Sequence, residues 1–252
     1  MEIEKNIQKF SADQSLDAHR LLDPLQDGVS ELRLVQVMGS DLDVVNDARA
    51  SFNRKRDVLD ERDRQLIRFL IKERHTSPLR GIVFKFEMKM PLYIARQWYK
   101  HHVASSYKEE QDGWNEASYR YLDATGENAD FYTPPVFHYL SESNRQASAG
   151  DLSLDENAKA QEIYAQALAA TNKAYEDLRK LGVCKQEARG ILPACVYTRV
   201  RWTVSAHALL WFVQLRSAEG AQTEIQKYSN ALRELVMPYI PETIKAFDEF
   251  GL

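Results

Sequence analysis

One segment constrains the fold of this chain most strongly, because residues 82–90 (IVFKFEMKM) alternate between apolar and charged side chains. Successive side chains of a β-strand point to opposite faces. One face would therefore carry the apolar side chains of Ile82, Phe84, Phe86, Met88 and Met90. The other face would carry Lys85, Glu87 and Lys89. The pattern predicts a strand with one buried face and one polar face.

The rest of the chain predicts one more strand and many helices. Residues 32–38 have the apolar density of a strand, which Gly39 ends. Asp41 is a candidate helix cap. Helical spacing, with Gly and Pro as stop signals, predicts helices over residues 44–52, 59–74, 92–104, 155–181, 185–192, 203–216 and 221–237. Residues 104–135 are predicted to form a long loop. We expect an α+β fold with a small mixed or antiparallel sheet and a long C-terminal helical part.

The domain organisation is predicted to be simple. No repeat, low-complexity tract or composition shift divides the 252 residues, which suffice for one sizeable core. We expect a polar N-terminal extension over residues 1–30, lying on the surface or on a partner subunit, and one domain over residues 31–252.

Composition excludes several classes of protein. With 33 Lys and Arg against 37 Asp and Glu, the formal net charge is −4, which gives no reason to expect a nucleic-acid polymer as partner. No apolar run reaches the roughly 18 residues of a membrane span, and the charged start does not resemble a signal peptide. Cys184 and Cys195 are too few for a disulfide framework or a four-cysteine zinc site. We expect a cytoplasmic protein without membrane contact.

Polar residues concentrate in three places: residues 75–78, residues 96–102 with 115–121, and residues 187–216. The last place holds Arg189, Arg199, Arg201 and Arg216 in segments whose apolar neighbours predict burial. Arginine is rarely buried without an anionic or carbonyl partner, and phosphate matches the guanidinium fork. Pairing with an internal glutamate is the alternative for any single arginine.

Common catalytic motifs are missing from the sequence. His101 and His102 would point about 100° apart on a helix, which makes a poor chelate, so no metal is expected. There is no GxSxG, GxGxxG or GxxxxGK[ST] motif. Cys195 lies in an apolar run predicted to be helical, where a thiol is more often inert packing than a nucleophile. Residue patterns alone therefore reach only an α+β domain with clustered arginines.

Several ordered blocks nevertheless resemble the flavin-dependent thymidylate synthase family over roughly residues 31–240. The segment ERHTSPLRG, the strand after it and ARQWYKHHVAS resemble the family's HxxPFEH, strand and ARQWxRHRxAS. NEASYRY resembles NExSxRY, and ARGILPACVYTR with LRSAEGAQTEI resembles the ARxxLP, YTR and LR…AQxEI elements. The blocks agree in order and spacing, apart from one insertion at about residues 107–114.

The resemblance implies a homotetramer that binds FAD between subunits and methylates uracil C5 of dUMP. Methylenetetrahydrofolate would supply the carbon and NADPH the hydride, without an enzyme nucleophile. The family positions that hold the nucleotide are matched here by Gln97, Lys100, Glu116, Ser118, Arg120, Arg189 and Arg216. Arg120 and Arg189 would bind the phosphate. Arg216 would face the uracil as a catalytic residue together with Ser118. The flavin positions are matched by Ser51, His75, Ser77, Lys100, His101, His102, Val103, Ser205 and His207.

The departures from the family pattern concern mainly the flavin and folate. Lys100, His101 and His102 stand for the family's Arg-His-Arg, His207 stands for an arginine, and Arg80 with Gly81 stand for Glu-His. Two interpretations follow. In the first, the protein is a divergent methylase with looser flavin binding that accepts UMP as well as dUMP, as the nucleoside-antibiotic methylases that resemble this family do. In the second, it has lost catalysis and acts as a nucleotide-binding or subunit-packing protein.

Overall fold

The computed structural model describes residues 20–252 except 100, 102–112, 127–128 and 143–147. Its main sheet has the strand order β1-β2-β6-β3 and is antiparallel throughout. The four strands are β1 (Glu31–Met38), β2 (Val83–Pro91), β6 (Tyr197–Ser205) and β3 (Trp114–Glu116). A separate hairpin pairs β4 (His138–Leu140) with β5 (Ser148–Asp151). The antiparallel sheet and the α+β class confirm the sequence-based prediction.

The helices fall into three groups along the chain. Before β2 lie α2 (Asp41–Arg49) with η1 (Ala50–Phe52), α3 (Glu61–Lys72) and η2 (Ser77–Arg80). Between β2 and β6 in the chain lie α4 (Leu92–Trp98), α5 (Leu154–Lys180), α6 (Lys185–Ala188) and η4 (Arg189–Ile191). After β6 come α7 (Ala206–Arg216), α8 (Thr223–Val236) and α9 (Pro241–Phe250). No helix in the described ranges combines the length and apolar character needed to span a bilayer.

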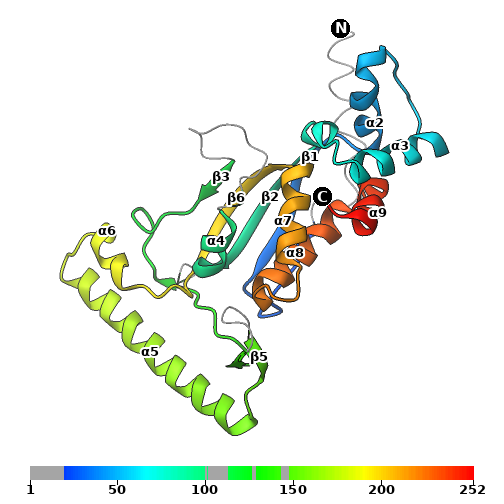
Figure 1. Ribbon diagram of the computed structural model, residues 1–252. Coiled ribbons are helices and arrows are strands. Elements are labelled where there is room, and N and C mark those ends of the chain that lie inside the picture. The colour runs from blue at the N-terminus through cyan, green and yellow to red at the C-terminus, as the bar shows by residue number, and fades with distance from the viewer. Residues whose placement is uncertain (1–19, 100, 102–112, 127–128, 143–147) are drawn as a thin grey trace.

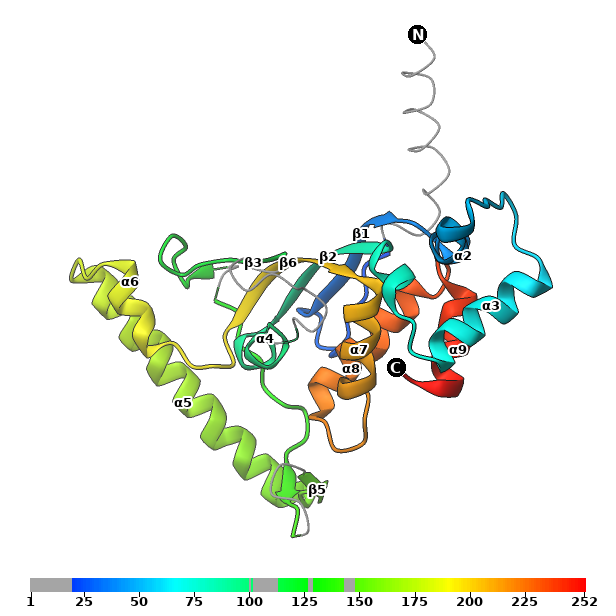
Figure 2. The same ribbon diagram turned by 45° about the horizontal axis from the view of Figure 1, so that its top comes forward.

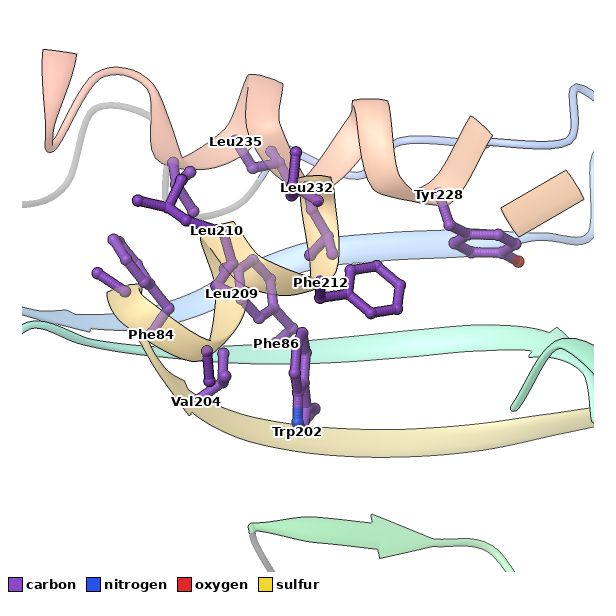
Figure 3. Close-up of a cluster of buried hydrophobic side chains, with 14 of the residues drawn as sticks. Phe84, Phe86, Trp202, Val204, Leu209, Leu210, Phe212, Tyr228, Leu232 and Leu235 are labelled. Atoms are coloured by element: carbon purple, nitrogen blue, oxygen red, sulfur yellow. The ribbon is translucent and has the colours of Figure 1, made fainter. Parts of the chain in front are cut away.

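Helices cover one face of the sheet, and the other face carries charged side chains. Figures 1 and 2 show α4, α7 and α8 on the same side of the strands. The alternation predicted over residues 82–90 holds, since Phe84 and Phe86 are fully buried on that side. Figure 3 shows these rings beside Trp202 of β6, Phe212 of α7 and further apolar side chains from α7 and α8. Burying each large apolar side chain stabilises the fold by about 1.5–3 kcal/mol.

The second central strand, β6, was not predicted. The sequence predicted a helix over residues 203–216, but α7 begins at Ala206 and residues 197–205 are extended. Val200 and Trp202 are buried under the helices, whereas Arg199 and Arg201 are exposed on the opposite face. The predicted burial of Arg199 and Arg201 is therefore wrong, and Arg189, for which burial was also predicted, is exposed as well. Their strand has the same alternating pattern as β2.

Further differences concern helix ends and short elements. Helix α4 ends at Trp98 although the pattern predicted a helix to residue 104, and β3 lies inside the predicted loop. Helix α9 was not predicted. Asp41 does not cap its own helix, because it is the first residue of α2 and follows Ser40 as N-cap. Its carboxylate instead accepts hydrogen bonds from the backbone N–H groups of Glu242 (2.6 Å) and Thr243 (3.0 Å), which begin α9.

Helix α5 stands away from the sheet in both ribbon views (Figures 1 and 2). Of its 27 residues only Tyr175 is buried. The Tyr175 hydroxyl accepts a hydrogen bond of 3.1 Å from the backbone N–H of Ala124. In its N-terminal half, the apolar side chains of Leu154 and Ile163 are exposed. The N-terminal half of the helix is attached through Asn157 and Gln161, which donate to the backbone carbonyl of Pro135 at 3.3 and 2.9 Å.

Candidate active site

A pocket of about 1000 Å³ opens where β2 ends and β6 begins. Its walls come from α4, β3, the segment that follows β3, and the turn between α6 and η4. The polar side chains that line it include Arg96, Glu116, Ser118, Arg120, Gln186 and Arg189. Four of the sequence-predicted nucleotide residues therefore meet around one cavity: Glu116, Ser118, Arg120 and Arg189.

Strand β3 positions Glu116 in this pocket. The residue pairs with Val200 of β6, so its side chain lies on the helix-covered face of the sheet. One carboxylate oxygen, Oε2, accepts a hydrogen bond of 3.1 Å from the Trp114 indole N–H. The other oxygen, Oε1, accepts one of 3.2 Å from the Thr198 hydroxyl. Both oxygens are thus fixed from the protein side.

The two predicted phosphate ligands are cations without an anionic partner in the described part of the chain. The Arg120 side chain donates through Nε to the Ser118 hydroxyl at 3.2 Å and lies over the Tyr121 ring at 5.4 Å. Arg189 donates through Nε to the backbone carbonyl of Gln186 at 3.3 Å. Among the described residues neither guanidinium forms an ion pair with a carboxylate, although both line the pocket. Such a pair of guanidinium groups suits a phosphate.

Arg216 and Gln97 lie beside the pocket, not in its lining. Arg216 ends α7 and donates through Nε to Nε2 of His101 at 2.9 Å. Burial lowers the pKa of the Arg216 guanidinium, but arginine stays charged in proteins. Gln97 donates to the side-chain oxygen of Gln222 at 2.5 Å. A predicted uracil ligand and a predicted flavin ligand, Arg216 and His101, are therefore in direct contact.

The remaining described flavin candidates lie at the other end of the central strands. Ser205 accepts a hydrogen bond of 3.3 Å from the backbone N–H of Ala208 and so caps α7. His207 follows in the first turn of α7, and 3₁₀ helix η2, which holds Ser77, packs beside this turn. Because β2 and β6 each have nine residues, this end of the strands lies roughly 26 Å from the end where the pocket opens. Within one subunit these flavin candidates therefore lie at the opposite end of the strands from the pocket opening, whereas His101 contacts Arg216 beside the pocket.

The cluster at this far end has polar groups free for a ligand. Nδ1 of His207 is buried and has no hydrogen-bond partner among the described residues. Burial, and then the charge of Arg80, lower the pKa of the His207 imidazole. His75 is exposed and packs edge-on against Phe69 with ring centroids 5.8 Å apart, and Ser51 is exposed in η1. These hydroxyls, imidazoles and the Arg80 cation fit a polar, anionic cofactor.

Three flavin or nucleotide candidates, Lys100, His102 and Val103, lie outside the described residues. The same is true of residues 107–112, most of the predicted insertion. Several residues that line the pocket were not predicted as site residues, among them Arg96, Trp114 and Gln186. Arg96 and Gln186 lie beside predicted site residues in the chain, which was the available signal. Among the described residues no three His, Cys, Asp or Glu side chains gather so as to hold a metal ion.

Comparison with known proteins identifies the family. Residues 33–242 match the sequence model of the family described as thymidylate synthase complementing protein. The chain is 39% identical over 224 residues to a flavin-dependent thymidylate synthase of Thermus thermophilus, covering 86% of this chain and 75% of that protein. It is 36% identical over 220 residues to the same enzyme of Thermotoga neapolitana, covering 87% of this chain and 91% of that protein. The chain belongs to the flavin-dependent thymidylate synthase family.

Solved structures agree with this family assignment. The crystal structure of the UMP/dUMP methylase PolB from Streptomyces cacaoi bound with 5-Br dUMP matches with a TM-score of 0.75 and 27% identity. The match covers 88% of this chain and 96% of that chain. The same methylase bound with 5-Br UMP matches with a TM-score of 0.74. The resemblance to flavin-dependent thymidylate synthases, drawn from motif blocks over roughly residues 31–240, is thereby confirmed.

Proposed function

We propose that this protein is a flavin-dependent methylase that converts dUMP to dTMP, with the pocket of about 1000 Å³ as its nucleotide site. The observation that carries the proposal is the pair Arg120 and Arg189, two pocket cations with no carboxylate partner in the described structure. A nucleotide monophosphate supplies the missing anion. The pocket volume is at the upper end of the range of about 300–1000 Å³ that small-molecule sites occupy.

The polar groups of the pocket suit the parts of a uracil nucleotide. Arg120, Arg189 and the Ser118 hydroxyl would hold the phosphate through charge-assisted hydrogen bonds. Glu116, fixed by two donors, would accept a hydrogen bond from the nucleotide. Arg216, as a permanent cation aligned by His101, would stabilise negative charge that develops on the uracil ring. Ser118 would also have a catalytic role, which the family position that it matches implies.

We propose FAD as the cofactor at the cluster around His207, with NADPH and methylenetetrahydrofolate as co-substrates. When bound, FAD supplies redox chemistry, by which reducing equivalents from NADPH complete the methyl group carried over from the folate. The protein's own residues would bind the cofactor through Nδ1 of His207, which has no partner among the described residues, the Ser205 and Ser77 hydroxyls, and the Arg80 cation. These groups would compensate for the family arginine that His207 replaces. Lys100, His101, His102 and Val103 complete the proposed cofactor set.

We also propose a homotetramer, because in a single subunit the flavin candidates around His207 lie at the end of β2 and β6 opposite the pocket opening, a strand length of roughly 26 Å away. A second copy can bring its own cofactor cluster to the nucleotide pocket, so that the active site is shared. The exposed α5, with Leu154 and Ile163 uncovered, offers surface for such packing. Light scattering of the purified protein tests this directly, and a monomer would contradict it.

A second substrate, UMP, is supported by one comparison. The structures bound with 5-Br dUMP and 5-Br UMP belong to a methylase whose fold this chain shares over 88% of its length. We therefore propose that the pocket accepts UMP as well as dUMP. A catalytically impaired, nucleotide-binding relative is the alternative that the altered flavin residues support.

The decisive experiment combines binding and single-turnover chemistry. The protein is titrated with FAD, with dUMP and with UMP, and then supplied with methylenetetrahydrofolate and NADPH. We expect a methylated product from dUMP, and a smaller or equal yield from UMP. Nucleotide binding without methylation, at saturating FAD, would favour the impaired relative. Failure of both nucleotides to bind would refute the proposed site.

A further inference from the structure

The end of the predicted insertion takes part in the nucleotide pocket. Gly113 and Trp114 come directly before the motif that begins with Asn115, and Trp114 is the first residue of β3. The backbone N–H of Thr203 donates to the carbonyl of Gly113 at 3.0 Å. A Cβ atom at Gly113 would lie 2.5 Å from the carbonyl oxygen of Thr203. Only glycine therefore allows this close approach, which pins the start of β3 against β6.

Strand geometry then decides where three side chains point. Trp114 and Glu116 are two residues apart, so they share one face of β3. Trp114 pairs with Trp202, and Glu116 pairs with Val200, both on the helix-covered face. Thr198 is two residues from Val200 and thus diagonally opposite Glu116. The same face therefore collects one carboxylate and two hydrogen-bond donors at the pocket wall.

The hydrogen bonds around Glu116 have a definite direction. The indole N–H of Trp114 can only donate, and it reaches Oε2 at 3.1 Å. The Thr198 hydroxyl reaches Oε1 at 3.2 Å, and Thr198 is 3% exposed. A carboxylate accepts about four hydrogen bonds and donates none, so each oxygen keeps a lone pair for the pocket. The indole is itself supported by Trp98, whose ring centroid lies 6.3 Å away.

From this arrangement we infer that Trp114 and Thr198 are positioning residues, which hold the Glu116 carboxylate so that it accepts a hydrogen bond from an N–H or O–H group of the bound nucleotide. The inference rests on the proposed function, since it assigns the pocket to a uracil nucleotide. Without the two donors, Glu116 could turn towards one of the arginines that line the pocket, Arg96, Arg120 or Arg189. The effect of both residues is therefore exerted on binding through Glu116 and not on the reacting atoms.

The test compares variants that remove single donors. Trp114→Phe keeps an aromatic ring and deletes the N–H, and Thr198→Val keeps the shape and deletes the O–H. We expect each to raise the Kd for dUMP and UMP about 3- to 30-fold, less than the direct loss of a hydrogen bond to a charged group, because each residue acts on binding only through Glu116. The kcat should stay within about threefold, since neither residue is expected to touch the reacting atoms. Thr198→Ser keeps the hydroxyl and should restore most of the affinity.

A double-mutant cycle separates positioning from general packing. In a Glu116→Ala background, Thr198→Val and Trp114→Phe should change the remaining dUMP affinity by less than about twofold. The matched control is Thr203→Val, the same substitution on the same strand but on its exposed face, which should leave the Kd unchanged. Thermal unfolding of each full-length variant checks that the fold is intact.

Two results would overturn the inference while the proposed function stands. One is an unchanged Kd in both single variants, with wild-type binding of dUMP. The other is the same loss of affinity with and without the Glu116 carboxylate, which would mean that Trp114 and Thr198 act only through packing. If the wild-type protein binds neither dUMP nor UMP, the proposed function and the inference fail together.

Discussion

Two groups of arginines, one on the open face of the sheet and one in the pocket, differ in their partners. On the open face of the sheet, Arg201 pairs with Glu87 at 2.5 Å, and Arg199 pairs with Glu31 at 2.8 Å. In the pocket, the side chains of Arg120 and Arg189 donate to a hydroxyl and to a backbone carbonyl, and the described residues offer neither of them a carboxylate. The sheet-face cations are neutralised within the chain, whereas the pocket cations need an outside anion. Pairing, and not residue type, therefore separates the sheet-face arginines from the arginines that we propose bind the nucleotide.

The largest effect is expected at Arg216. Replacing it by alanine should lower kcat by about 10²–10³-fold, the usual loss when a charge-stabilising donor is removed from an active site. The matched control on the sheet face is Arg201→Ala, which should keep kcat within about twofold, because exposed ion pairs contribute little. Single-turnover methylation of dUMP measures both. Equal losses in the two variants would contradict a catalytic role for Arg216.

The next effect concerns binding. Arg189→Ala should weaken dUMP binding by about 1.5–3 kcal/mol, the scale of a hydrogen bond to a charged group. Arg199→Ala, the control from the sheet face, should leave the affinity unchanged, since Arg199 already has Glu31 as partner. Calorimetric titration with dUMP gives both values. An unchanged affinity in Arg189→Ala would remove this residue from the phosphate site.

Much of the fold could be predicted because its signals are local. The alternation over residues 82–90 gave β2, and helical spacing gave α3, α5 and α8. Strand β6 carries the same alternation, with Val200, Trp202 and Val204 between polar residues. It was missed because the helix predicted from the apolar run that follows it was begun too early, at residue 203 instead of Ala206. The three-residue β3 is too short to carry a pattern. Its place depends on pairing with a strand more than 80 residues later.

The site was partly predictable for a similar reason. Motif blocks identified Glu116, Ser118, Arg120 and Arg189, and the structure brings these four to one pocket. Burial of the arginines was judged from apolar neighbours in the chain, which says nothing of partners far away in sequence. Arg199 and Glu31 are 168 residues apart. The same holds for Thr198 and Glu116, which only the sheet register places together.

The smallest effect tests the sheet face alone, through Glu87. Hydrogen bonding to Arg33, followed by the charges of Arg33 and Arg201, holds the pKa of this carboxyl below its usual value of 4.5, although burial opposes the shift. A lowered folded-state pKa means that the carboxylate stabilises the fold above the unfolded pKa. That stabilisation is lost as the pH falls through the folded value. Glu87→Gln should therefore lower the free energy of unfolding by about 0.2–1 kcal/mol at neutral pH.

This difference between wild type and Glu87→Gln should shrink as the pH is lowered below about 4, where the unfolded carboxyl is already protonated. Urea unfolding at several pH values measures it, and added salt should reduce it because Arg33 and Arg201 are half-exposed or more. Nucleotide affinity should not change in this variant, since Glu87 lies on the open face. A loss of dUMP binding in Glu87→Gln would show that the two arginine groups are coupled, and the contrast between a self-neutralised face and a ligand-binding pocket would then be wrong.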